Sequence, residues 1–176
     1  MRNIWRVLAM AAGLVSASEA AESTAGFWQH RIETEMPIAA SPARVWALLM
    51  DFGQHTQWNP FIRHIEGQAE VGQKLRVRVQ PAGGSEMGFE PLVLVVKPLE
   101  EFRWKGRFVM PGLFDGEHYF QLRAQEDGGT LLVHGERFSG LLVPLLRGQL
   151  DTGTRAGFRA MNEALKSEAL KSGVMH

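Results

Sequence analysis

A capped amphipathic helix that leads into an aromatic-proline corner, between Ser41 and Phe61, is the feature that most constrains the fold of this chain. Ser41 is a preferred helix N-cap, and Pro42 suits the first helical position, where a missing N–H costs nothing. One face of the segment carries apolar residues at helical spacing, namely Val45, Leu48, Leu49 and Phe52. The sequence therefore predicts a helix that begins at Pro42 and stops at Gly53.

The corner itself, from Trp58 to Phe61, is predicted to be a packed turn. Pro60 holds Asn59 in an extended conformation, which favours a turn at this point. The aromatic side chains of Trp58 and Phe61 are then expected to fill part of the core.

Strands are predicted on both sides of the helix, because apolar and polar residues alternate there with a period of two. The first strand runs from Trp28 to Ile38. Pro91 implies an edge strand or a bulge in its segment. Such alternation is typical of a curved antiparallel sheet with one wet face and one covered face. The remaining predicted strands cover residues 74–80, 87–97, 102–105, 114–123 and 130–138, with a hairpin turn at Asp127-Gly128-Gly129.

A long helix from about Pro144 to Lys171 is predicted to cover the apolar side of that sheet. Its apolar stripe consists of Leu146, Leu150, Phe158, Met161 and Leu165. Gly153 and Gly157 share one face of this helix, and each costs about 1 kcal/mol relative to alanine. Two explanations remain open. Either the glycines make room for an apolar ligand, or they allow close packing against a bulky strand residue such as Trp104.

The order of these elements, together with several short motifs, resembles one known architecture. The motifs are Ser41-Pro42-Ala43-Arg44-Val45-Trp46 with Asp51-Phe52, Trp58-Asn59-Pro60-Phe61, Phe114-Asp115-Gly116, Phe138-Ser139-Gly140, and the terminal helix through Phe158 and Met161. Over residues 27–171 the chain resembles the START/Bet v1-like (SRPBCC) superfamily, in its polyketide cyclase/dehydrase-like branch. The resemblance implies an α+β helix-grip fold, with a curved antiparallel sheet wrapped around the C-terminal helix and a hydrophobic cavity between them. It leaves the function open, because members of one fold differ in chemistry.

The predicted hairpin brings polar residues together on the inner face of the sheet. With its turn centred near Asp127, the facing pairs are His118 with Glu136, Phe120 with His134, and Leu122 with Leu132. An imidazole beside a carboxylate in an apolar cavity can act as general acid and base on an enolisable substrate. The alternative is that His118 and Glu136 satisfy each other as a core polar pair, or hold one end of a ligand, because an isolated buried charge is costly.

Composition excludes several function classes. The 176 residues, 45% of them hydrophobic, suffice for one core and predict a single domain. Nineteen basic and nineteen acidic residues give no net charge, so no long-range attraction to nucleic acid is expected. The absence of cysteine excludes disulfides and thiolate metal sites. A zinc site of His118, His134 and Glu136 lacks a recognised ligand motif, and neither a metal nor another cofactor is predicted.

Residues 1–21 are predicted to be a signal peptide or a plain N-terminal extension. Arg2 and Arg6 precede the apolar run from Val7 to Val15, and small residues follow near Ala21. The run is too short to span a bilayer of about 30 Å, so no stable membrane anchor is expected. Cleavage near Ala21 would export the protein to the periplasm or the medium. The acidic residue just before that site favours the alternative, a cytoplasmic protein with an uncleaved extension.

Three functions are consistent with these predictions. The first is a carrier or sensor for a small hydrophobic ligand such as a lipid, a polyketide or an aromatic compound. The second is a cyclase or dehydratase that uses His118 and Glu136 as acid and base, and the third is a module that binds an apolar segment of a protein partner. The residues predicted to surround the ligand are Trp58, Trp104, Phe114, Phe120, His134, Phe138, Gly153, Gly157 and Met161.

Overall fold

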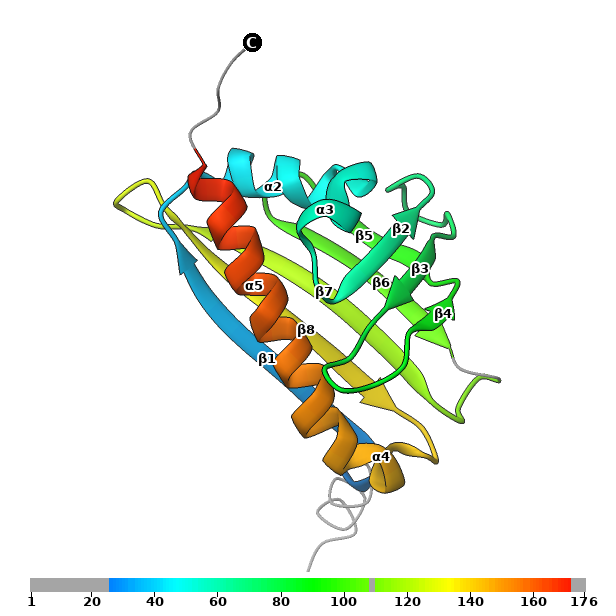
Figure 1. Ribbon diagram of the computed structural model, residues 1–176. Helices are drawn as coiled ribbons and strands as arrows, with labels where there is room; N and C mark the ends of the chain where they lie inside the picture. Colours follow the sequence, from blue (N-terminus) through cyan, green and yellow to red (C-terminus); the bar gives the residue numbers. More distant parts are fainter. Residues whose placement is uncertain (1–25, 108–109, 172–176) are drawn as a thin grey trace, which may run out of the picture.

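The computed structural model describes residues 26–107 and 110–171, which form an α+β fold of two antiparallel sheets and a long C-terminal helix (Figure 1). The larger sheet has five strands in the order β1-β8-β7-β6-β5, and the smaller sheet has three in the order β2-β3-β4. The elements are β1 (Gln29–Ile38), α2 (Pro42–Met50), the 3-10 turn η1 (Phe52–Gln54), α3 (His55–Trp58), β2 (Ile62–Glu66), β3 (Arg76–Val79), β4 (Met87–Phe89), β5 (Leu92–Lys97), β6 (Glu101–Arg107), β7 (Asp115–Ala124), β8 (Thr130–Ser139), α4 (Val143–Gln149), the π-helical turn η2 (Leu150–Thr154) and α5 (Arg155–Leu170).

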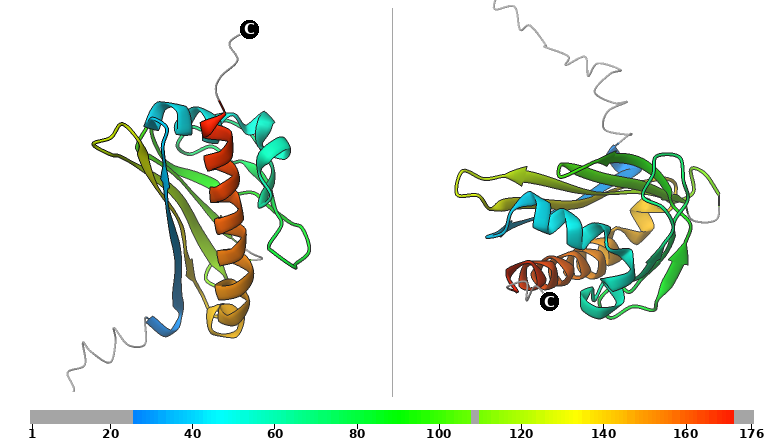
Figure 2. Two further views of the ribbon diagram at one scale, coloured as in Figure 1. Left: turned by 60° about the vertical axis from the view of Figure 1, so that its left-hand side comes forward. Right: turned by 90° about the horizontal axis from the view of Figure 1, so that it is seen from above.

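The large sheet curves around the C-terminal helix, which lies along its concave face (Figure 2). This arrangement confirms the predicted helix-grip fold. No helix in the described ranges is both long enough and apolar enough to cross a membrane. The predicted signal segment, residues 1–21, lies outside the described residues.

The structure has two sheets where the sequence predicted one. The reasons lie in the segments before and after β3. Simple alternation does not predict strand β2, because its buried residues Ile62 and Ile65 lie three apart rather than two. A register shift between Ile62 and His64 brings both onto the inner face. Pro91 then separates β4, at the edge of the small sheet, from β5, at the edge of the large one. The implied interruption at Pro91 is therefore a change of sheet.

The helix predicted from Pro42 to Gly53 begins as expected but ends earlier, at Met50. The Ser41 hydroxyl accepts a hydrogen bond from the Arg44 N–H at 3.3 Å, which confirms the N-cap. Asp51 leaves the helical conformation, and the chain continues through η1 and α3. The change of direction keeps the Phe52 ring against the core, 5.9 Å from the ring of Phe102.

Asn59 holds the predicted corner in place. Its carboxamide oxygen accepts hydrogen bonds from the N–H groups of Phe61 and Ile62, at 2.9 and 2.8 Å. Its amide nitrogen donates to Nδ1 of His55, whose Nε2–H donates to the Leu49 carbonyl. Asn59 is fully buried, so every polar atom that it brings into the core is used. The corner therefore fixes both the exit of α3 and the start of β2.

The C-terminal helix is continuous from Val143 to Leu170, with the π-helical turn η2 in its middle. The predicted stripe faces the sheets, since Leu150, Phe158, Met161 and Leu165 are buried and Leu146 packs at its edge.

Gly157 permits close packing with the corner. A Cβ atom at Gly157 would overlap with the ring of Phe61, which also packs edge-on against Phe158 at 5.3 Å. A Cβ atom at Gly153 would meet only Ala82 and Pro81, at ordinary distances of 3.6 and 3.7 Å. Close packing therefore accounts for Gly157, although the partner is Phe61 rather than the predicted Trp104.

We expect Gly157→Ala to lower the free energy of unfolding by about 1–3 kcal/mol, because the new methyl group must displace the Phe61 ring. Gly153→Ala is the matched control on the same face and should leave stability unchanged or raise it. Chemical denaturation of both variants measures the difference. Equal stabilities would show that the Phe61 contact does not require glycine.

Candidate functional site

The facing strands β7 and β8 pair in the predicted register. His118 lies opposite Glu136, Phe120 opposite His134, and Leu122 opposite Leu132. His118 and His134 are 4% and 0% exposed, which places both imidazoles inside the core. Trp104 stacks on His118 with ring centroids 4.6 Å apart, and Phe158 stacks on His134 at 3.9 Å. Two imidazoles are thus held between aromatic rings with little access to water.

These polar groups form a continuous hydrogen-bonded chain, called here the inner relay. It runs from Glu136 through His118, His134 and Asn162 to Thr34. The separations are 3.4 Å from Glu136 Oε2 to His118 Nδ1, 3.0 Å between the two Nε2 atoms, 2.7 Å from His134 Nδ1 to Asn162 Oδ1, and 2.9 Å from Asn162 Nδ2 to Thr34 Oγ1. The sequence predicted the first pair but not the connection to α5 and β1.

The donor and the acceptor of each hydrogen bond in the inner relay can be assigned by starting from Thr34 at one end. The Thr34 hydroxyl has one proton, which it donates to the His134 carbonyl at 3.1 Å. It can therefore only accept from Asn162, whose amide nitrogen must face Thr34 and whose oxygen must face His134. His134 accordingly carries its proton on Nδ1 and leaves Nε2 as an acceptor.

The same reasoning fixes the proton at the other end. Because His134 Nε2 accepts, His118 must donate from its own Nε2, and a neutral His118 then offers only a lone pair at Nδ1. A hydrogen bond between Glu136 and His118 needs one further proton, either on the carboxyl group or as a second proton on the imidazole. The inner relay thus allows two states, a neutral acid with neutral imidazoles or an ion pair of carboxylate and imidazolium.

Burial favours the neutral state. It raises the pKa of Glu136 to about 8 and lowers the pKa of His118 to about 3, because both charged forms would lose their hydration. Burial, and to a lesser extent the proximity of His118, also holds the pKa of His134 well below its usual value. At neutral pH the site therefore contains a carboxylic acid backed by two neutral imidazoles.

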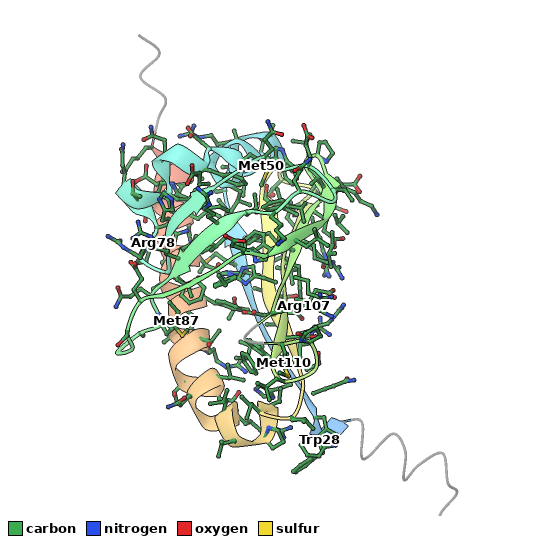
Figure 3. All side chains as sticks on the ribbon, turned by 90° about the vertical axis from the view of Figure 1, so that its right-hand side faces the viewer. Trp28, Met50, Arg78, Met87, Arg107 and Met110 are labelled. Carbon is green, nitrogen blue, oxygen red and sulfur yellow. The ribbon has the colours of Figure 1, made fainter. Side chains whose placement is uncertain are left out.

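A cavity of about 150 Å³ lies next to this acid, between the two sheets and the C-terminal helix. Three ionisable residues line it, namely His118, Glu136 and the exposed Arg107. Met87 on β4 and Arg107 on β6 lie on opposite sides of the gap between the sheets at this point (Figure 3). The rest of the lining is mainly apolar: Phe61, Val79, Pro81, Met87, Gly88, Phe89, Trp104, Gly106, Phe114, Gly116, Phe138, Leu150 and Thr154.

The structure brings five of the predicted site residues to the cavity and leaves six away from it. Those that line it are Trp104, Phe114, His118, Glu136 and Phe138. Phe120, His134 and Met161 are buried in the core and do not line the cavity, and Gly157 is covered by Phe61. Trp58 packs against His55 at the corner, and Gly153 faces Pro81 and Ala82. These six residues pack elsewhere in the structure and do not form the surface of the cavity.

Sequence reasoning missed the wall that the small sheet provides and the floor that two glycines provide. Gly106 and Gly116 are direct partners in the pairing of β6 with β7, and both line the cavity. A Cβ atom at Gly106 would press on the Phe89 ring at 3.1 Å, and one at Gly116 would overlap with Glu136 Oε1. Glycine inside a predicted strand is a signal of close approach that could have revealed this floor.

No group of three residues among His, Cys, Asp and Glu in the described ranges is arranged to hold a metal ion. The two imidazoles use their facing nitrogen atoms for each other, so neither is free as a ligand in the observed arrangement.

Comparison with known proteins identifies the family. The family model described as "Polyketide cyclase / dehydrase and lipid transport" matches residues 29–170. The chain belongs to this family. No curated protein matches the sequence.

Solved structures of two aromatase/cyclases and of Ara h 8.0201 share the fold of this chain. The di-domain aromatase/cyclase BexL from the BE-7585A biosynthetic pathway is 14% identical, with a TM-score of 0.70, and the match covers 88% of this chain and 54% of BexL. The chain thus spans about half of that two-domain protein. Zhui aromatase/cyclase from Streptomyces sp. R1128 is 19% identical, with a TM-score of 0.66 and coverage of 80% and 93%. Ara h 8.0201 is 16% identical, with a TM-score of 0.56 and coverage of 79% and 99%.

The pKa values predict how stability depends on pH. The unfolded chain titrates Glu136 near 4.5 and His118 near 6.5, whereas the folded protein titrates them near 8 and 3. Between 4.5 and 6.5 the two histidines, His118 and His134, make stability rise with pH and Glu136 makes it fall, so the effects oppose. Between 6.5 and 8 only Glu136 differs, since the folded state keeps a proton that the unfolded state has lost. Stability should therefore fall over that range, by about 2 kcal/mol.

Glu136→Gln should abolish this decline while it preserves the inner relay, because a Gln amide N–H can donate to His118 Nδ1 as the acid does. Denaturation of both proteins at pH 6.5 and 8 tests the prediction. A decline of equal size in the variant would show that another group is responsible.

Proposed function

We propose that the protein binds a small apolar molecule, about the size of one aromatic ring, in the cavity beside Glu136. The largely apolar lining of a concave cavity is the observation that carries this proposal. An apolar cavity of about 150 Å³ is large enough for benzene, whereas drug-sized ligands need about 300–1,000 Å³. A lipid or a polyketide would therefore place only one ring or one chain end inside and leave the remainder outside the cavity.

The family description, which covers both lipid transport and cyclase or dehydrase activity, supports binding of a hydrophobic molecule. A carrier or sensor role is consistent with the way the inner relay ends. Its last member, the Thr34 hydroxyl, donates its proton to the His134 carbonyl, and the chain of hydrogen bonds does not continue beyond it. The relay thus provides a fixed polar anchor rather than a path for protons to the surface.

Toluene binding tests the proposal directly. We expect toluene to raise the melting temperature and to change the emission of Trp104, which lines the cavity. Val79→Phe and Leu150→Phe fill the cavity from β3 and from the C-terminal helix, and each should weaken binding by at least about tenfold. Val71→Phe is the control, because Val71 is 66% exposed and does not line the cavity. Unchanged binding in both filled variants, if they remain folded, would contradict the proposal.

An enzyme that uses Glu136 as general acid and base is the second candidate. The observation that favours it is the raised pKa of Glu136, about 8, in a cavity that a substrate can enter. His118 would position the carboxyl group and stabilise either protonation state. This role corresponds to the cyclase or dehydratase chemistry in the family description.

Hydrogen exchange at a ring ketone separates the two candidates. Cyclohexanone in D₂O exchanges its α-hydrogens when a base removes one and a deuteron returns to the same carbon. An acid-base enzyme should accelerate this exchange, and Glu136→Gln should abolish the acceleration while the ketone still binds. A carrier should leave the exchange rate at the value for buffer. NMR spectroscopy follows both the exchange and the binding.

A further inference from the structure

One oxygen of Glu136, Oε1, is not used by the inner relay and lies beside the cavity floor. Oε2 faces His118, whereas Oε1 lies over Gly116, where any larger side chain would overlap with it. Gly116 and Glu136 both line the cavity. Among residues 26–107 and 110–171, the hydrogen bond and ion pair formed by the Glu136 side chain both use Oε2. The floor of the cavity is therefore shaped to present Oε1 to whatever occupies it.

The hydrogen-bonding character of Oε1 is the same in both states that the inner relay allows. In the neutral state the acid proton lies on Oε2, because only there can it meet the lone pair of His118 Nδ1, and Oε1 is a carbonyl oxygen. In the ionised state His118 carries the extra proton and Oε1 is a carboxylate oxygen. Both are acceptors and neither is a donor. A proton on Oε1 would instead leave Oε2 and Nδ1 with facing lone pairs, which is unfavourable.

We propose that the ligand is a ring-sized molecule with one hydroxyl or N–H group, which donates a hydrogen bond to Glu136 Oε1. The inference rests on the cavity being the binding site and adds the chemical class of the ligand. A phenol or a cyclic alcohol fits this class. A ketone or an ether of equal size should bind more weakly, because two acceptors would face each other, and a carboxylate would place two negatively polarised groups together. The inner relay thus determines specificity, through Thr34, Asn162 and the two histidines.

A matched series of ligands tests this inference. Toluene, phenol and benzoate have similar size, and differ in carrying no polar group, a donor, or a negative charge. Phenol should bind about 5–10-fold more tightly than toluene, and benzoate more weakly than either. Calorimetric titration at pH 7 measures all three affinities.

Two variants at Glu136 distinguish an oriented acceptor from a general effect of polarity. Glu136→Gln should keep the preference for phenol, because its amide nitrogen donates to His118 Nδ1 and its oxygen faces the cavity. Glu136→Met should remove the preference and keep toluene binding, which also shows that the cavity is intact. If toluene binds and phenol binds no better, the inference is overturned while the proposed binding function stands. Failure of the whole series to bind would overturn the proposed function and the inference with it.

Discussion

The hydrogen bond between His134 and Asn162 joins the C-terminal helix to the concave face of the large sheet, and the state of the site depends on it. Its length is 2.7 Å, and both residues are at least 99% buried. Because Thr34 fixes the orientation of Asn162, this bond fixes the tautomer of His134 and then that of His118. Asn162 on α5 and Thr34 on β1 thereby set the tautomers of the imidazoles beside the cavity, although neither residue lines it. Burial then favours the neutral acid at Glu136, next to His118.

The floor of the cavity depends on two glycines in the strands of the large sheet. Gly106 and Gly116 are paired on neighbouring strands of the large sheet, and their lack of side chains lets Phe89 and Glu136 lie close against these strands. The small sheet closes the cavity from the other side through Val79 and Phe89. Phe61 completes the wall and is itself held by contact with Gly157. The same corner that shapes the fold thus bounds the site.

The convex face of the large sheet shows how tertiary contacts can override a local pattern. Tyr119 lies between Glu117 and Gln121 along a face expected to be wet, yet only 1% of it is exposed. Its ring covers Gly135 on β8, where a Cβ atom would overlap with it. The guanidinium groups of Arg31, Arg103 and Arg137 lie 5.3–6.0 Å from the ring centre and shield it from water.

The sequence by itself determined the helix N-cap at Ser41, the corner at Asn59, the hairpin register and the helical stripe, because each depends on residues close together in the chain or on a regular period. Counting outward from the turn at Asp127 is enough to place His118 beside Glu136, and the strands pair in that register. The sequence also contained the family resemblance, which fixed the helix-grip fold.

Only the tertiary structure decided the rest of the site. The division into two sheets depends on the register shift in β2 and on the position of Pro91, and neither the small sheet's role as a wall nor the partner of Gly157 follows from periodicity. The inner relay joins residues of β1, β7, β8 and α5 that are up to 128 positions apart in the chain. No local pattern encodes such contacts, because they arise only when separate elements pack together and bury polar groups that must then satisfy one another.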